Sequence, residues 1–209
     1  MNVLYHDNLI EKLLFETYSC TDISLCTGKM GISIFFYRYA NKYNQNIYQG
    51  FAEILLDEVA EDLDDSLPID FETGLAGIGW GIDFLVYNNF VGGNVDDILQ
   101  MIDYEIISNL RQDFSIQNMM KINQYIICRL NNTKSNKIKK DYSNILQLCL
   151  KEMKDSNDIK QIEGCFLDID SYNRKNILNK IPENNIELNN KNLGLKDGLA
   201  GFLYKKLLI

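Results

Sequence analysis

The sequence has little of several things: one histidine, two prolines, one tryptophan and no Cys-x-x-Cys pair in 209 residues. With a single histidine, the usual zinc sites of cysteine and histidine have few ligands to draw on. The cysteines number five, which is odd, and none lies in a Cys-x-x-Cys pair. This pattern favours reduced thiols over a disulfide framework. An all-β sandwich of this size would carry more proline in its turns, so two prolines argue against that class. Long segments without helix breakers favour an all-α protein instead.

Positive charge is also scarce. Lys and Arg number 21 against 29 Asp and Glu, which gives a net charge of −8 and a pI near 4.7. Nucleic-acid and anionic-membrane binders need clustered cations, so we expect neither partner. No apolar run reaches the roughly 18 residues of a membrane span, and the first residues lack the basic and apolar regions of a signal peptide. We therefore expect a cytoplasmic protein, with its oligomeric state left open.

The most informative feature is an internal repeat. Three segments begin with Gly-x-x-Gly and continue into an apolar stretch, and their glycines are Gly28 and Gly31, Gly74 and Gly77, and Gly198 and Gly201. Gly74 follows Gly28 by 46 residues, and Gly198 follows Gly74 by 124, close to three further units of about 41. A degenerate copy begins at Asp113, with Gln117 and Met120 at the glycine positions, and a further weak copy is expected near residue 157.

Amphipathic helices are predicted between the repeated segments, over residues 47–63, 95–110 and 141–153. Asn94 stands at the N-cap position of the second, with Asp97 three residues later. Residues 77–90 are apolar nearly all round, as expected of a helix packed on two sides. Each unit therefore combines an apolar inner helix with a half-exposed outer helix. A helix over about 4–18 is expected to cover the last inner helix.

The glycines suggest where a ligand could bind. At the start of an inner helix they allow close approach of neighbouring backbones, and we expect them to leave the first N–H groups uncovered. A ring of such helix N-termini would form a funnel suited to an anionic or carbonyl-bearing ligand. The candidate funnel-lining residues are Gly28, Gly31, Gly74, Gly77, Trp80, Asp83, Gly198 and Gly201. The alternative is that the glycines serve only packing and turns.

Carboxylates give weaker hypotheses. Asp83 lies in an apolar helix, where an ionised carboxylate needs a partner, and we expect pairing with an arginine such as Arg38 or Arg129. As a general base it would need a second group that the sequence does not indicate. Asp168 and Asp170 could form the carboxylate pair of a glycoside hydrolase, or be two ordinary acids.

The repeated segments resemble the lanthionine synthetase C-like (LanC-like) family. The resemblance lies in residues 25–36, 74–85 and 195–203, which read LCTGKMGISIFF, GLAGIGWGIDFL and LKDGLAGFL. It implies an all-α fold, a two-layered α/α toroid, in one domain over residues 1–209 that is shorter than full-length members. It also implies a role in modifying ribosomally made peptides. The family's cyclases bind one zinc through a Cys and a later Cys-His pair.

This sequence departs from that family at the metal ligands. None of its five cysteines is followed by histidine, and His6 lies outside every repeat. Although zinc is expected for the family, we expect no metal and no cofactor here. The preferred hypothesis is a LanC-like protein that binds a peptide substrate or a peptide-maturation protein, and whether it is an enzyme stays open. The alternatives are a toroid enzyme that acts on peptides or sugars through inner-face acids, and a purely structural homologue.

Overall fold

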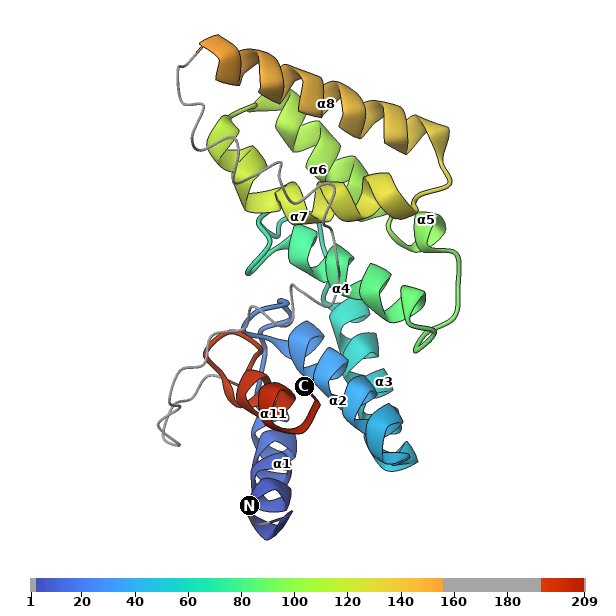
Figure 1. Ribbon diagram of the computed structural model, residues 1–209, viewed down its shortest axis with the longest axis vertical. Coiled ribbons are helices and arrows are strands. Elements are labelled where there is room, and N and C mark those ends of the chain that lie inside the picture. Colours follow the sequence, from blue (N-terminus) through green and yellow to red (C-terminus); the bar gives the residue numbers. More distant parts are fainter. Residues whose placement is uncertain (1–2, 156–192, 209) are drawn as a thin grey trace. The chain divides into compact units, whose positions relative to one another are not determined.

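The computed structural model describes residues 3–155 and 193–208, which form helices joined by loops and contain no strand (Figure 1). The helices are α1 (Val3–Thr17), α2 (Lys29–Tyr43), α3 (Asn46–Glu61), α4 (Leu75–Tyr87), α5 (Val95–Ile98), α6 (Gln100–Gln112), α7 (Ile116–Asn132), α8 (Asn136–Asp155) and α11 (Leu199–Leu208). The all-α class is therefore confirmed for the described residues. The weak copy near residue 157 lies outside them, as do Asp168 and Asp170.

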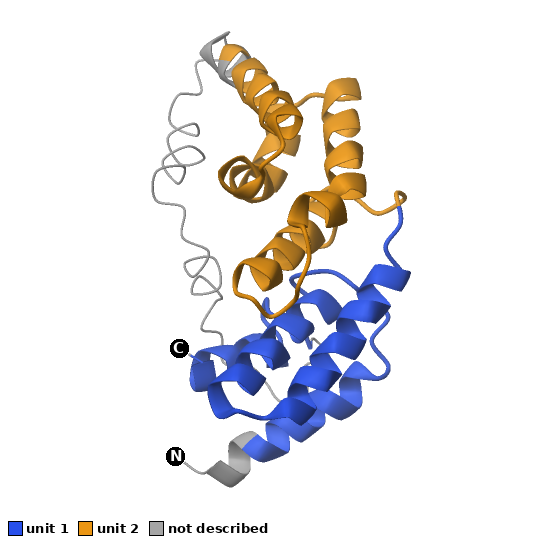
Figure 2. Ribbon diagram, turned by 90° about the vertical axis from the view of Figure 1, so that its right-hand side faces the viewer, with its two compact units in different colours: residues 1–64, 175–209 blue, residues 65–174 orange. Residues whose placement is uncertain are grey.

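The chain divides into two compact units, coloured separately in Figure 2. Unit 1 comprises residues 1–64 and 175–209, and unit 2 comprises residues 65–174. The toroid and the single domain stay predictions, because both concern the arrangement of the two units.

In unit 1, α2 is an inner helix and α3 is its outer partner. Phe36 of α2 is fully buried, stacks on Tyr48 at a ring-centroid distance of 5.8 Å and meets Phe51 edge-on at 5.0 Å. The hydroxyl of Ser33 donates to the carbonyl of Ala52 at 2.9 Å. Because aromatic pairs and a buried hydrogen bond join the two helices, the predicted inner and outer pairing is confirmed for this hairpin.

The last described helix returns to the first elements of the chain. Lys42 of α2 donates to the carbonyl of Leu207 at 2.6 Å, and the Arg38 guanidinium lies 5.3 Å from the ring centre of Tyr204. Helix α1 also packs against α11, with Leu9 and Leu13 buried. The expectation that the first helix covers the last inner helix is therefore confirmed.

Unit 2 is built around α4 and α7. Trp80 of α4 is fully buried, stacks on Phe84 at 5.5 Å and meets Phe71 edge-on at 5.8 Å. Helix α4 packs on α7 and α6, and α8 packs on α7. The degenerate repeat does begin an inner helix, α7, but Ser115 is its N-cap and accepts from the Asn118 N–H at 3.1 Å.

The outer segments of unit 2 differ from their predicted limits. The helix expected over 95–110 is divided into α5 and α6 at Leu99, and the helix expected over 141–153 begins five residues earlier, at Asn136. Asn94 is the N-cap, as predicted, and its side-chain oxygen accepts from the Asp96 N–H at 3.2 Å. The Asp97 carboxylate accepts from the Asn94 amide at 2.8 Å. This cap fixes the end of α5 that borders the groove described below.

Candidate functional site

The eight residues predicted to line a funnel are all buried. Gly28 and Gly74 are the N-caps of α2 and α4, and Gly198 directly precedes α11. Gly28 and Gly74 have φ values of −117° and −124°, which any residue can adopt. A Cβ at Gly28 would overlap the carbonyl of Asp22, and one at Gly74 would overlap that of Pro68. Close backbone approach, and not unusual backbone conformation, explains these two glycines.

The expectation of uncovered N–H groups is wrong for Lys29, Leu75 and Ala200, which stand at the starts of α2, α4 and α11. The Lys29 N–H donates to the carbonyl of Asp22 at 2.8 Å, and the Leu75 N–H donates to that of Pro68 at 2.8 Å. In α11 the Ala200 N–H donates to the Leu193 carbonyl at 3.0 Å. In each case the accepting carbonyl stands seven residues before the donor, so the preceding loop folds over the helix start. These N–H groups are engaged within the chain and do not donate to a ligand, while the funnel itself stays a prediction.

Two of these loops are braced by the same pair of residue types. The hydroxyl of Thr27 donates to the Asp22 carboxylate at 2.5 Å, and that of Thr73 donates to the Asp70 carboxylate at 2.9 Å. Each threonine directly precedes the N-cap glycine, so Asp, Thr and Gly form one structural unit. In the third loop Asp197 replaces the threonine and has a φ of 54°.

Asp83 has partners other than the expected arginines. Its carboxylate accepts from the Cys128 thiol at 2.8 Å and from the Asn132 amide at 3.1 Å. Arg129 forms its ion pairs with Asp96 and Asp103. Because Asp83 is only 2% exposed and joins α4 to α7, its contacts are those of a structural acid.

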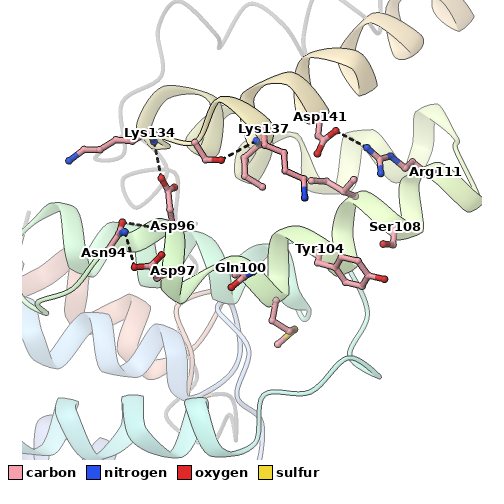
Figure 3. Close-up of a pocket in the computed structure, with 14 residues that line it drawn as sticks. Asn94, Asp96, Asp97, Gln100, Tyr104, Ser108, Arg111, Lys134, Lys137 and Asp141 are labelled. Carbon is pink, nitrogen blue, oxygen red and sulfur yellow. Dashed lines mark hydrogen bonds and ion pairs between the residues drawn. The ribbon is translucent and has the colours of Figure 1, made fainter.

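The described residues form a groove on unit 2, with a cavity volume of about 850 Å³ (Figure 3). The groove lies between α5 and α6 on one side and the start of α8 on the other. Its lining residues are Asn94, Asp96, Asp97, Gln100, Met101, Tyr104, Ile107, Ser108, Arg111, Lys134, Ser135, Lys137, Ile138 and Asp141. Its lining combines charged, polar and apolar side chains, so it can contact both the polar and the apolar groups of a ligand.

Asp96 connects this groove to a buried polar network. The Asp96 carboxylate accepts from Arg129 Nη2 at 2.8 Å, from the Thr133 hydroxyl at 2.6 Å and from the Lys134 N–H at 2.9 Å. Arg129 is fully buried and also donates to Asp103, with a shortest N···O distance of 2.7 Å. The loop between α7 and α8 is thereby held to α5.

The centre of the network is the Asp103 carboxylate. It is 1% exposed and accepts from the hydroxyls of Tyr125 and Tyr142, each at 2.8 Å, in addition to Arg129. Tyr125 lies on α7, Tyr142 on α8 and Asp103 on α6. Both walls of the groove, α6 and the start of α8, are therefore joined to the same buried carboxylate.

The network shifts the pKa of four of its groups, Tyr125, Tyr142, Arg129 and Asp96. Burial, together with the charge of Asp103, raises the pKa of Tyr125 and of Tyr142 well above the usual value, so both hydroxyls stay donors. Burial alone would lower the pKa of Arg129, but its bonds to Asp103 outweigh burial and raise it. For Asp96, burial acts to raise the pKa, while the bonds from Thr133 and Arg129 outweigh it and lower the pKa.

No three His, Cys, Asp or Glu side chains within the described residues lie close enough together to hold a metal ion. Four of the five cysteines are described, Cys20, Cys26, Cys128 and Cys149, and none of these four forms a disulfide. The described side chains therefore do not bring together the set of ligands that the family uses for zinc. No helix in the same part of the chain is both long and apolar enough to cross a membrane.

Comparisons with protein-family models, with curated proteins and with solved structures found no match to this chain. The LanC-like resemblance therefore stays a prediction. Sequence reasoning did not find the groove, whose residues come from α5, α6 and α8. One signal was present: residues 134–140 contain four lysines and no acid.

Proposed function

We propose that this chain is a cytoplasmic LanC-like protein that binds a peptide of ribosomal peptide modification, or a protein of that machinery, without zinc-dependent cyclisation. The peptide would lie in the groove of unit 2. The observation that carries the proposal is this groove, whose cavity volume of about 850 Å³ falls in the range of ligand sites.

The lining of the groove suits a peptide. Met101, Ile107 and Ile138 can contact apolar side chains, while Ser108 and Gln100 can bond to the peptide backbone. The Asp103 network supports both walls, which reduces the ordering that binding would require. A preformed groove with mixed lining is the feature that favours peptide binding over a purely structural role.

The LanC-like part of the proposal is supported by the repeated segments. Two of the three share the Asp-Thr-Gly bracing, and in all three the loop folds over the start of an inner helix. The sequence lacks a Cys-His pair, so the proposal is one of binding. Stoichiometric zinc in the purified full chain, lost on Cys26→Ala, would contradict it.

The test is to select peptides by display against the full chain and measure their affinities for two matched variants. Ser108 lines the groove on α6, and Asn109, its neighbour on the same helix, is exposed and lies outside the lining. We expect Ser108→Trp to fill the groove and weaken binding by about tenfold or more, and Asn109→Trp to leave it unchanged. Failure to select any peptide, or equal binding by both variants, would contradict the proposal.

A further inference from the structure

A cluster of lysines borders the groove. Lys134, Lys137, Lys139 and Lys140 fall within seven residues that contain no acid, and all four are exposed. The whole chain carries a net charge of −8, so this segment has the opposite sign to the rest of the protein. A local excess of positive charge on an acidic protein creates a surface that attracts anionic groups.

The position of these lysines is not explained by helix stability. Lys137, Lys139 and Lys140 lie in the first turns of α8, which begins at Asn136 and has no acid in its first turn. Cations at a helix N-terminus oppose the helix dipole, where acids would be favourable. The positive end of the dipole and the lysines therefore add to one positive potential at the edge of the groove.

None of the four lysines forms an ion pair with another described residue. The nearby carboxylates have other partners: Asp141 pairs with Arg111 at 2.7 Å, and Asp96 pairs with Arg129 at 2.8 Å. Asp97 accepts from Asn94. Within the described part of unit 2, the lysine charges thus stay available to a ligand, while the acids beside them are already engaged.

Two of the lysines, Lys134 and Lys137, line the groove itself. In Figure 3 the side chain of Lys137 extends from α8 toward α6. The opposite wall presents Met101, Tyr104 and Ile107, and also the carboxylates of Asp96 and Asp97. Because these two carboxylates already accept from Arg129 and Asn94, the lysine charge on one wall and the apolar side chains on the other match a ligand whose own side chains alternate between acidic and apolar.

We infer that the groove binds an acidic peptide segment, in which Asp or Glu side chains meet Lys137 and apolar side chains lie against α6, while Lys134, whose side chain extends away from the groove in Figure 3, adds positive charge at its edge. This inference rests on the proposed function and specifies its ligand. A nucleic acid fits less well, because the wall opposite the lysines presents apolar side chains and carboxylates to a run of phosphates.

The test measures binding of a fluorescent peptide in which Glu alternates with Leu and Tyr, and of the same peptide with Gln in place of Glu. Lys137→Gln is compared with Lys121→Gln, which removes the same charge from an exposed position on α7 outside the groove. We expect Lys137→Gln to weaken binding of the acidic peptide about two- to fivefold, and Lys121→Gln to leave it unchanged. Adding Lys134→Gln should increase the loss.

Salt provides a second readout, because exposed ion pairs are screened. Raising the salt concentration from about 50 to 300 mM should weaken binding of the acidic peptide to the wild type. The same change should have less effect on its binding to the Lys134→Gln, Lys137→Gln double variant. The emission of Trp80, buried in unit 2, checks that each variant is folded.

The outcomes separate this inference from the proposed function. If the Glu and Gln peptides bind equally and Ser108→Trp blocks both, the acidic preference is overturned while peptide binding stands. If neither the Glu peptide, the Gln peptide nor any displayed peptide binds, both the acidic-peptide inference and the proposed peptide-binding function are wrong. If single-stranded DNA or phosphatidylserine vesicles bind more tightly than the Glu peptide, with the same dependence on Lys137, the inferred partner is wrong.

Discussion

Replacing Arg129 with methionine should destabilise unit 2 strongly. Arg129 is fully buried and pairs with Asp103, which is itself 1% exposed, at 2.7 Å, and with Asp96 at 2.8 Å. Methionine preserves much of the side-chain volume but donates no hydrogen bond. The variant would leave the Asp103 carboxylate buried, with only the hydroxyls of Tyr125 and Tyr142 as its remaining donors among the network residues.

The magnitude follows from the burial of the pair. Removing one partner of a buried ion pair costs about 3–5 kcal/mol, because an uncompensated charge stays in the interior. A single domain is typically stable by about 5–15 kcal/mol, so Arg129→Met would remove a large fraction of that stability. Asp103→Leu in the same chain would remove the stranded charge, and we expect it to restore part of the loss.

The chain contains a matched control. Arg111 pairs with Asp141 at the same N···O distance of 2.7 Å, but its side chain is 60% exposed. Arg111→Met should therefore cost at most about 1 kcal/mol. The assay is urea denaturation followed by the fluorescence of Trp80, the chain's one tryptophan, which lies in unit 2. Equal destabilisation by the two variants would refute the reasoning that burial sets the energy of the pair.

Three further outcomes can be checked by denaturation. Gly31→Ala should cost about 1–3 kcal/mol of folding stability, because a Cβ there would overlap the carbonyl of Leu25. Gly50→Ala in α3 should stabilise the fold by about 0.5–1 kcal/mol, because the space around its Cβ is open. Circular dichroism measures the unfolding of both variants. Tyr142→Phe removes a donor at 2.8 Å from Asp103 and should cost about 1.5–3 kcal/mol, whereas a loss below about 0.5 kcal/mol would show that the bond contributes little. Because the folded-state pKa of Asp96 is lowered, its ionised form stabilises the fold above the ordinary carboxyl pKa, so the stability gap between wild type and Asp96→Asn should close as the pH falls through the lowered pKa. A gap that widens toward acidic pH would mean that the sign is wrong.

Local signals in the sequence were enough to place most helices. Hydrophobic periodicity located α3 within two residues at each end, and the Gly-x-x-G pattern marked the starts of α2, α4 and α11. Asn94 was recognised as a cap because capping depends on residues only two or three positions apart. The split at Leu99 was missed, since residues 95–110 keep a helical pattern across it.

The packing of the first helix against the last was also predicted, from the repeat itself. A chain of hairpins that ends on an inner helix leaves an apolar surface uncovered, and α1 is the segment that packs on α11. The role of the glycines was only half predicted. The close approach of neighbouring backbone at the glycines is confirmed. The hydrogen bonds from N–H groups at the helix starts to carbonyls seven residues earlier were not predicted, because the spacing of the glycines does not reveal them.

The sequence by itself determined the repeat, the Asn94 cap and the places of most helices, because each depends on neighbours within a few residues. The tertiary structure decided the partners of the buried charges and the place of the groove. Arg129 bonds to Asp103 and Asp96, which lie 26 and 33 residues earlier, and Asp83 bonds to Cys128, 45 residues later. A buried charge binds whichever partner the folding of the chain brings within hydrogen-bond distance, and no periodic pattern in the sequence specifies that partner.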